Sequence, residues 1–357
     1  MKWQALVFTG LVLAGCGVPG SEVRRFSSSG DATFPARRAT VLVMGCTLDP
    51  GQRATLASDD ARHVISEVEL FCLAVGDDGV VAPTEPAEVT AALATAADVR
   101  SLGYHVTFGL VIGDAWSAPY PAAHAGKLLG DAKAMQAFPA ALGPFVAAVD
   151  GLDVAPWPLP TSARADAVAF LATVRGALPS GTSLSVQVPP SVSDPSDLID
   201  GDAFDVASLG AIADRVRVMT LDYSDPSAPG PTTDPGWAVL AYRLAHQQAS
   251  GVTIDVALPL YGWDFTNGVA TSVSWSDSIG LARAHGVPIT RGPSGVPRSS
   301  FDDGGAHHDV FCDDAGSLTL DLGAWDTATL PSDVGVLYWG LGAEDPALWA
   351  AIRGGAR

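Results

Sequence analysis

Short apolar runs alternate along the chain with longer segments whose apolar residues recur at helical spacing. Eight of these runs, nearly continuous in apolar residues, have the character of strands buried on both faces. They are residues 39–46, 67–75, 104–112, 149–156, 183–189, 215–223, 253–262 and 334–342. The segments between them, such as 86–103 and 162–178, suit amphipathic helices. Eight such units predict an α/β fold, a (β/α)8 TIM barrel over residues 39–357, rather than an open doubly wound sheet.

The longest interruption, about 70 residues, separates the seventh and eighth predicted strands. A single helix needs far fewer residues, so we expect a small insertion at about 265–330. This segment contains "AHHDVFCDD", in which His307 and His308 are adjacent. Adjacent side chains of an extended segment point to opposite faces, which favours a polar hairpin over a shared metal ion. No metal site is therefore expected. No cofactor is expected either, because the sequence contains no glycine-rich phosphate loop.

Composition narrows the possible partners. The chain of 357 residues is 48% hydrophobic, which is ample for a buried core. Its 20 Lys and Arg face 39 Asp and Glu, giving a net charge of −19. Such a charge opposes binding to the phosphates of a nucleic acid or to an anionic membrane surface.

The N-terminus predicts export. Lys2 precedes an apolar run, residues 3–13, that is too short to span a bilayer. The run ends in "LAGC", which resembles a bacterial lipobox and implies a signal peptide over 1–15 with lipid attached to Cys16. Gly17, rather than Asp, favours the outer membrane by the same resemblance. The alternative is an ordinary secretory signal with an incidental cysteine.

After Cys16, residues 16–38 are rich in Ser, Gly, Pro and Arg and are expected to form a flexible tether. Three further cysteines follow: Cys46, Cys72 and Cys312. An exported chain lives in an oxidising compartment, so one disulfide is possible, but the sequence does not choose the pair.

Four strand ends carry a family resemblance. "DGLDVAPW" resembles the strand-four signature of glycoside hydrolase family 18, the chitinase-like barrels, whose pattern is Asp-Gly-x-Asp-x-Asp-x-Glu. "VMTLDYSDPSAPGP", "VALPLYGWDF" and "GVLYWGLGAEDPALW" resemble strands six, seven and eight of that family, especially in branches related to spore-cortex and cell-wall hydrolases. The matches span residue 39 to about residue 349.

The resemblance implies a mechanism that this chain departs from. In the family the sugar's own N-acetyl oxygen attacks the anomeric carbon, so the enzyme supplies a general acid, a carboxylate that orients the acetamide, and a tyrosine that hydrogen-bonds it. Here three of these positions are changed, and several flanking ones are kept. The changed positions are Ala155 for the orienting aspartate, Trp157 for the acid and Leu221 for the tyrosine; Asp150, Gly151, Asp153, Met219 and Asp222 match.

Aromatic residues at the strand ends offer sugar-stacking surfaces. Trp339 resembles the tryptophan that floors the family's cleft, although an ordinary core aromatic is the alternative. Tyr261 and Trp263 either extend this floor or pack under the insertion, and Trp157 either stacks on sugar or plugs the mouth. We expect ligand contacts from a set at the mouth of the barrel. The set is Asp153, Trp157, Met219, Asp222, Tyr261, Trp263 and Trp339, with Asp150 beside it.

Three functions remain open. The leading hypothesis is a lipid-anchored envelope protein that binds an N-acetylglucosamine-containing glycan, of peptidoglycan or chitin type, without cutting it. The second is an active hydrolase with a displaced acid. The third is a structural envelope protein whose barrel is plugged.

Overall fold

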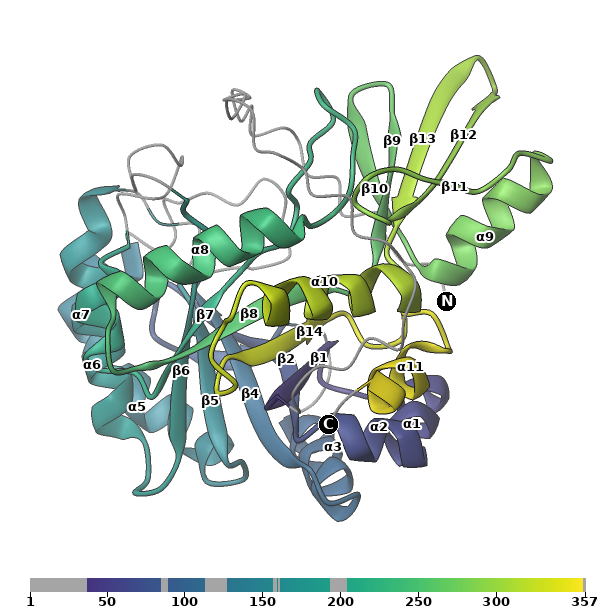
Figure 1. The fold of residues 1–357 in the computed structure, drawn as a ribbon. Helices are drawn as coiled ribbons and strands as arrows, with labels where there is room; N and C mark the ends of the chain where they lie inside the picture. Colours follow the sequence, from purple (N-terminus) through teal and green to yellow (C-terminus); the bar gives the residue numbers. More distant parts are fainter. Residues whose placement is uncertain are drawn as a thin grey trace.

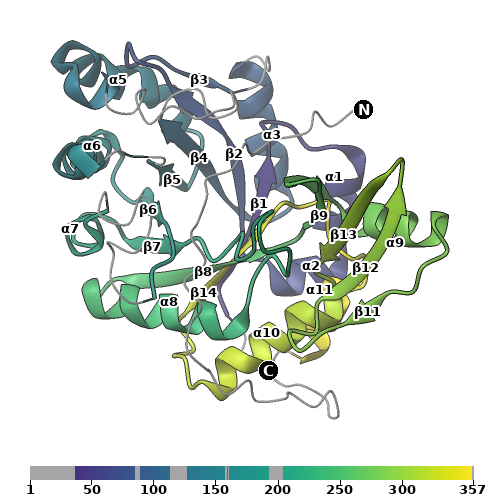
Figure 2. The same ribbon diagram turned by 90° about the horizontal axis from the view of Figure 1, so that it is seen from above.

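A closed ring of eight parallel strands forms the centre of the molecule. The computed structural model describes residues 37–84, 89–112, 127–156, 159, 161–192 and 204–355. The barrel strands are β1 (Ala39–Met44), β2 (Glu67–Val75), β4 (His105–Ile112), β5 (Gly151–Ala155), β6 (Ser183–Val188), β7 (Arg215–Val218), β8 (Thr253–Pro259) and β14 (Gly335–Trp339). Because β1 pairs with both β14 and β2, the sheet closes on itself (Figures 1 and 2). The predicted (β/α)8 barrel is confirmed.

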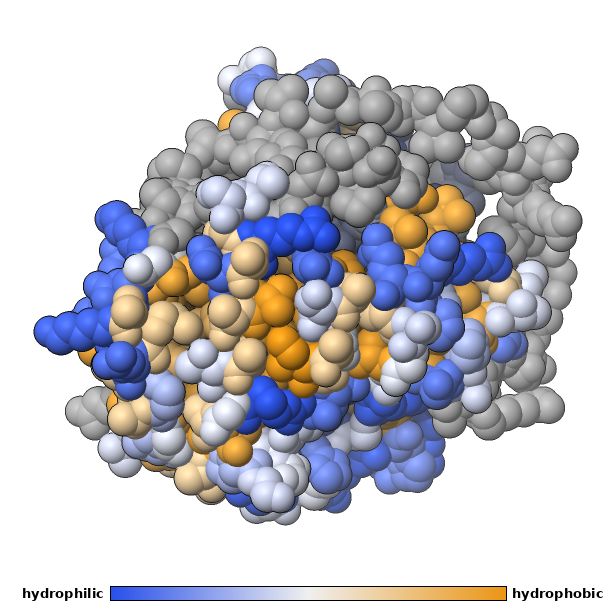
Figure 3. All heavy atoms as spheres, turned by 90° about the vertical axis from the view of Figure 1, so that its left-hand side faces the viewer, coloured by the Kyte–Doolittle hydropathy of each residue, from blue (hydrophilic) through white to orange (hydrophobic). Residues whose placement is uncertain are grey.

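Helices cover the outside of the ring. They are α1 (Pro50–Ala57), α2 (Asp59–Val64), α3 (Val89–Ser101), α5 (Ala132–Val146), α6 (Arg164–Ala177), α7 (Val206–Gly210), α8 (Pro235–Gln248), α10 (Ala315–Thr327) and α11 (Leu348–Gly355). Outward strand residues such as Leu152 and Val154 are completely buried in the core beneath them. On the side seen in Figure 3, hydrophilic and apolar side chains are interspersed. No helix of the described part is long and apolar enough to cross a membrane.

Short elements complete the barrel. The strand β3 (Val81–Pro83) extends β2 antiparallel, and a 3-10 turn, η1 (Thr161–Ala163), precedes α6. A disulfide joins Cys46, just after β1, to Cys72 on β2, whereas Cys312 is a buried free thiol. The structure thereby settles the pairing among the three cysteines.

A separate antiparallel sheet lies between β8 and β14. Its strands are β9 (Gly262–Thr266), β10 (Val269–Val273), β11 (Thr290–Arg291), β12 (Pro297–Asp303) and β13 (Ala306–Cys312), in the order β10-β9-β13-β12-β11, accompanied by α9 (Trp275–Ala284). Figure 1 shows it rising beside the barrel. The sheet occupies 262–312, so the expected bounds of 265–330 reach into α10, which contacts the barrel helices α8 and α11.

The two adjacent histidines lie on β13 and have different partners. His307 is 2.8 Å from Asp302 across the β12–β13 hairpin, while His308 is 2.8 Å from Asp264 on β9. No group of three or more His, Cys, Asp or Glu that could hold a metal occurs in residues the structure describes.

Charged side chains fill the part of the barrel interior that lies toward the amino ends of the strands. Arg217 on β7 is completely buried and reaches Glu67 at 2.7 Å, Asp153 at 3.2 Å and Asp255 at 3.4 Å. It also donates a hydrogen bond to a carboxyl oxygen of Glu69. These side chains point inward because they occupy alternate positions of their strands.

The inner network is close to charge balance. Burial and the neighbouring Asp153 raise the pKa of Glu69 well above its usual value, despite the opposing charge of Arg217. A raised pKa favours the neutral form of Glu69, and the other three acidic side chains face three guanidinium groups. These are Glu67, Asp153 and Asp255 against Arg38, Arg215 and Arg217.

Two glycines make room for these charges. A Cβ atom at Gly335 would lie 2.1 Å from a carboxylate oxygen of Asp255, and one at Gly109 would lie 2.7 Å from Oε1 of Glu69. Both distances are shorter than van der Waals contact, so a side chain at either site would displace the network.

An apolar layer lies above the charges. It consists of one cluster of inward residues near the carboxyl ends of the strands, with Met44, Ala74, Leu221 and Trp339 packed against it. The buried members are Leu42, Phe71, Val111, Ala155, Met219, Ala257 and Leu337. This layer separates the charged interior from the mouth of the barrel.

Removal of the central guanidinium should strongly destabilise the fold. We predict that Arg217→Met lowers the free energy of unfolding by about 3–5 kcal/mol, because it leaves buried carboxylates without a counter-charge. Urea denaturation measures this change. Arg53→Met, which breaks the exposed ion pair with Asp98, is the matched control and should have little effect. Equal losses in the two variants would contradict a special role for Arg217.

Glu69 should make stability depend on pH. Its folded-state pKa is raised, so the folded protein keeps the proton at pH values where the unfolded chain has lost it. Stability should therefore fall as pH rises above the usual carboxyl pKa of 4.5. Glu69→Gln should remove this contribution, so that the variant gains stability relative to the unmodified protein between about pH 5 and pH 8. Thermal melts of both proteins across that range test it; parallel curves would show that Glu69 is ionised in the fold.

Candidate functional site

Asp222 lies just beyond β7, where two aromatic residues hold it. The hydroxyl of Tyr261 and the indole N–H of Trp263 each donate a hydrogen bond to the same oxygen of Asp222, both at 2.8 Å. Tyr261 links β8 to β9 and Trp263 lies on β9, so the inserted sheet supplies the donors. The two rings meet edge to face with centroids 5.5 Å apart. These contacts join the insertion to the barrel mouth.

The backbone of Asp222 is in the left-handed region, with φ of 59°. Aspartate tolerates this conformation better than most residues, but it still costs free energy, and such residues cluster at functional sites. Asp222 remains exposed to solvent. Even so, the surrounding protein removes enough water to raise its pKa, although the bonds from Tyr261 and Trp263 act in the opposite direction. Asp222 is thus an exposed residue whose carboxyl group, enclosed by Tyr261 and Trp263, has a raised pKa.

Trp339 lies at the end of β14, half-buried against the apolar layer. Its ring packs on Phe71 of β2 with centroids 5.2 Å apart and planes inclined by 57°. Met219 is buried in the same layer, and Leu221 is half-buried against it. Ala155 belongs to the same layer, so Trp339 packs against the layer that contains the strand-four position at which the family has its orienting carboxylate.

The strand-four motif residues lie at different depths in the barrel. Ala155 lies in the apolar layer, and Asp153 lies one layer deeper, fully buried, accepting a 2.6 Å hydrogen bond from Gln187. The expectation that Asp153 faces the mouth is therefore wrong. Asp153 is instead a partner of Arg217. Trp157 lies outside the described residues.

Asp150 lies at the opposite end of the barrel, and the expectation that it lines the mouth is also wrong. It precedes β5, accepts a hydrogen bond from the backbone N–H of Val106 at 2.9 Å, and lies 3.2 Å from Arg100. The physical reason is where the strand begins. Asp150 immediately precedes β5, which extends from Gly151 toward the mouth and leaves Asp150 at the amino end.

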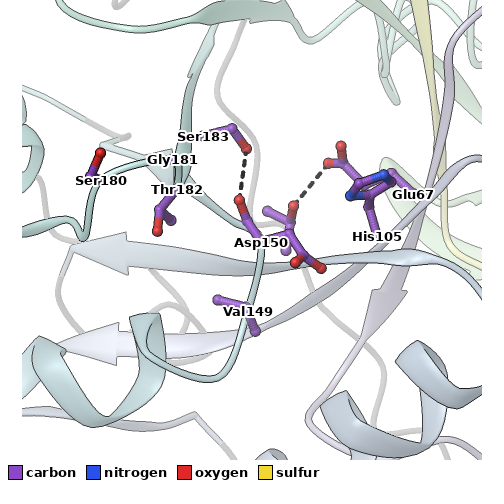
Figure 4. Close-up of a pocket in the computed structure, with 9 residues that line it drawn as sticks. Glu67, His105, Val149, Asp150, Ser180, Gly181, Thr182 and Ser183 are labelled. Carbon is purple, nitrogen blue, oxygen red and sulfur yellow. Dashed lines mark hydrogen bonds between the residues drawn. The ribbon is translucent and has the colours of Figure 1, made fainter.

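A cavity of about 470 Å³ opens at that amino end (Figure 4). Four of its lining residues, Glu67, His105, Asp150 and Ser183, begin or immediately precede barrel strands. Its Glu67 accepts a hydrogen bond from Thr107 and pairs with Arg215 and Arg217. In barrels of this kind the amino end serves stability and the carboxyl end carries function. We therefore place the candidate site at the mouth, around Asp222 and Trp339.

Sequence reasoning missed the network below this site. Arg215 and Arg217 alternate with valines in "RVRV", and Glu67 and Glu69 alternate in the same way on β2. Charges at period two in a strand buried on both faces were the available signal. Phe71, the partner of Trp339, carried no distinguishing signal.

Comparison with known proteins identifies solved structures with the same fold. No protein-family model matches the chain. The spore cortex-lytic enzyme SleL of Bacillus cereus superposes with a TM-score of 0.77 at 20% identity, over 91% of this chain and 76% of that one. A class V chitinase from Pseudomonas fluorescens gives 0.75 at 20% identity, over 89% and 99%. The chain has a chitinase-like barrel.

Sequence relatives agree with this assignment. The cortical fragment-lytic enzyme of Bacillus anthracis is 28% identical over 192 residues, which are 51% of this chain and 44% of that protein. An uncharacterized glycosylase of Bacillus subtilis is 25% identical over 160 residues, 43% of this chain and 46% of that protein. The matched region is thus less than half of either relative. The chitinase-like resemblance expected from the strand ends is confirmed.

Proposed function

We propose that this chitinase-like barrel binds an N-acetylglucosamine-containing glycan at its mouth without cleaving it. The proposal rests on one observation: the side chains at the mouth differ in kind from those at the catalytic motif positions. The mouth presents Trp339 and the hydrogen-bonded Asp222, whereas the position of the orienting carboxylate is Ala155, inside an apolar layer. Its relatives are named as chitinases and cortex-lytic enzymes, which supports a glycan ligand.

Retained and lost groups have different chemical uses. An aromatic face stacks on the apolar face of a pyranose ring, and a carboxylate accepts hydrogen bonds from sugar hydroxyls; neither contact requires proton transfer. Cleavage in this family instead needs a proton donor and groups that hold the acetamide. The side chains of Ala155 and Leu221 offer no polar atom, and the indole of Trp157 does not act as an acid.

Asp222 favours a second candidate, a hydrolase with a displaced acid. The residue is exposed just beyond β7, and the pKa of its carboxyl group is raised. A carboxylic acid with a raised pKa is the usual proton donor in glycoside cleavage. The missing acetamide-holding groups make this candidate weaker than binding alone.

Isothermal titration with N-acetylglucosamine oligomers should detect binding with a dissociation constant in the micromolar to millimolar range, on the order of 4–8 kcal/mol. Trp339→Ala should weaken binding about two- to tenfold, because a stacking surface is lost. Asp222→Asn should have a smaller effect on binding, since the asparagine oxygen still accepts the bonds from Tyr261 and Trp263. Product analysis should show no turnover above background.

The same variants separate the alternatives. Turnover that Asp222→Asn abolishes and Asp225→Asn, a loop control, leaves intact would establish the displaced-acid hydrolase. Absence of both binding and turnover with chitin, peptidoglycan and xylan ligands would favour the structural envelope protein.

The anchor is a separate part of the proposal. It rests on "LAGC" in the sequence, and Cys16 lies outside the described residues. Cys16→Ser should leave the protein without lipid and release it from the membrane fraction, because the thiol is the attachment point. Fractionation and mass measurement of the mature chain test this. Unchanged membrane association of the variant would mean that a lipid on Cys16 is not the anchor.

A further inference from the structure

The inserted sheet joins the barrel through two neighbouring segments of chain. It enters through Tyr261, which precedes β9, and leaves through Asp313, which follows β13. Gly262 and Cys312 are opposite each other in the antiparallel pairing of these strands, so Tyr261 and Asp313 are neighbours just outside it. A Cβ atom at Gly262 would lie 2.1 Å from the carbonyl oxygen of Phe311, so the two segments are in close contact. We call Tyr261, Gly262, Cys312 and Asp313 the insertion joint.

The joint contains a buried carboxyl group. Asp313 is 1% exposed, and its Oδ1 accepts a 2.8 Å hydrogen bond from the hydroxyl of Ser317 on α10. Asp321, one turn beyond Ser317 on the same helix, is also 1% exposed. The Oδ2 atoms of Asp313 and Asp321 have no hydrogen-bond partner among the described residues. Each aspartate therefore keeps one oxygen in the protein interior without a donor, which opposes its ionisation.

The groups around these two aspartates are mostly acidic. They are Asp314 at the start of α10, Asp234 at the start of α8, Arg291 of β11, Asp345 beyond β14, and Tyr261 and the Cys312 thiol of the joint. Arg291, the cation of this set, donates a 3.1 Å hydrogen bond to Asp314. Its charge is thus shared between Asp313 and Asp314.

This environment changes the titration of both aspartates. Burial and the neighbouring Asp314 raise the pKa of Asp313 to about 7, against the opposing effects of Ser317 and Arg291. Burial, together with Asp313 and Asp234, raises the pKa of Asp321 well above its usual value. The closed joint therefore holds a proton on Asp313 at pH values where a hydrated aspartate, with its usual pKa of 3.8, has lost it. The stability of the closed joint should fall as pH rises from about 4 and stop falling above about 7.

The joint is connected to the barrel mouth. The charge of Asp313 acts on the hydroxyl of Tyr261, and this hydroxyl donates the 2.8 Å bond to Asp222. Ionised Asp313 would place a second negative charge behind a phenol that already faces a carboxyl group. Opening of the joint would give Asp313 water as a donor and relieve this repulsion.

We propose that Asp313 makes the insertion joint sensitive to pH, so that its protonated form holds the inserted sheet against the barrel mouth and its ionisation loosens this attachment. Tyr261 and Trp263 come from the insertion and are the donors to Asp222, so loosening of the joint would alter the candidate site. The inference concerns the attachment of the insertion and does not require that the mouth bind a glycan.

Hydrogen exchange at individual amides tests the joint. The full-length protein is exchanged at several pH values from 5 to 9, and the rates are corrected for the intrinsic effect of pH on amide exchange. The opening constant of amides in β9 and β13 should rise on the order of ten- to hundredfold between pH 5 and pH 8 and then level off. Asp313→Asn stays neutral and can still accept the bond from Ser317, so its insertion should keep the low opening constant at every pH.

Asp303→Asn is the matched control, because it removes one acidic group from the exposed tip of the β12–β13 hairpin. It should show the same rise as the unmodified protein. Thermal melts at pH 5 check folding, and Asp313→Ser is a second neutral variant if Asp313→Asn does not fold. No rise in the unmodified protein, or an equal rise in the neutral variants, would overturn the proposal. No glycan is present in the experiment, so its outcome is independent of the proposed glycan binding.

Discussion

The ion pairs of Arg217 hold the interior of this barrel together. A guanidinium group with no exposed surface is tolerated only where carboxylates surround it, and here they come from β2, β5 and β8. Strands on different sides of the ring thus meet at a single side chain. Replacement of only one partner would leave a buried charge uncompensated, which costs more than the intact network gains over an apolar core. The network therefore constrains its members to be kept or changed together.

This charged layer determines what the mouth can contain. Along an inward-facing strand position, the next layer is two residues further, about 6.6 Å higher. On β5 the step leads from Asp153 to Ala155, and on β7 it leads from Arg217 to Met219. The upper positions are apolar, so they cover the charges and keep water from them. The hydrogen-bonding side chains at the mouth are instead Asp222, beyond the end of β7, and Tyr261 and Trp263, which the insertion provides.

The sequence predicts the barrel well because each strand is buried on both faces and reads as an apolar run. The position of each residue along the barrel axis is harder to predict. Asp150 and Asp153 sit three residues apart in one motif, yet one lies at the amino end of the barrel and the other in its centre, because β5 begins between them. Tyr261 and Trp263 left two possibilities open from sequence, and a contact with Asp222 depends on how the insertion folds back on β7. Pairing of Cys46 with Cys72 required the same three-dimensional information, since three thiols allow three pairs.

The changed motif positions pack together in one layer of the barrel. Ala155 and Leu221 both contact the apolar layer, and Trp339 packs against it. An aspartate at 155 alone would bury a second carboxyl group directly above Asp153, without a new cation to pair with it. Its charge would raise the cost of ionising Glu69, Asp153 and the new group together. A site for the acetamide would therefore need several changes together. Besides the aspartate at 155, it would need a tyrosine at 221 that hydrogen-bonds the acetamide and a general acid at 157. Stacking of a sugar ring on Trp339 would have no such requirement, because an aromatic face needs neither a charged partner nor a proton transfer to hold the apolar face of a pyranose.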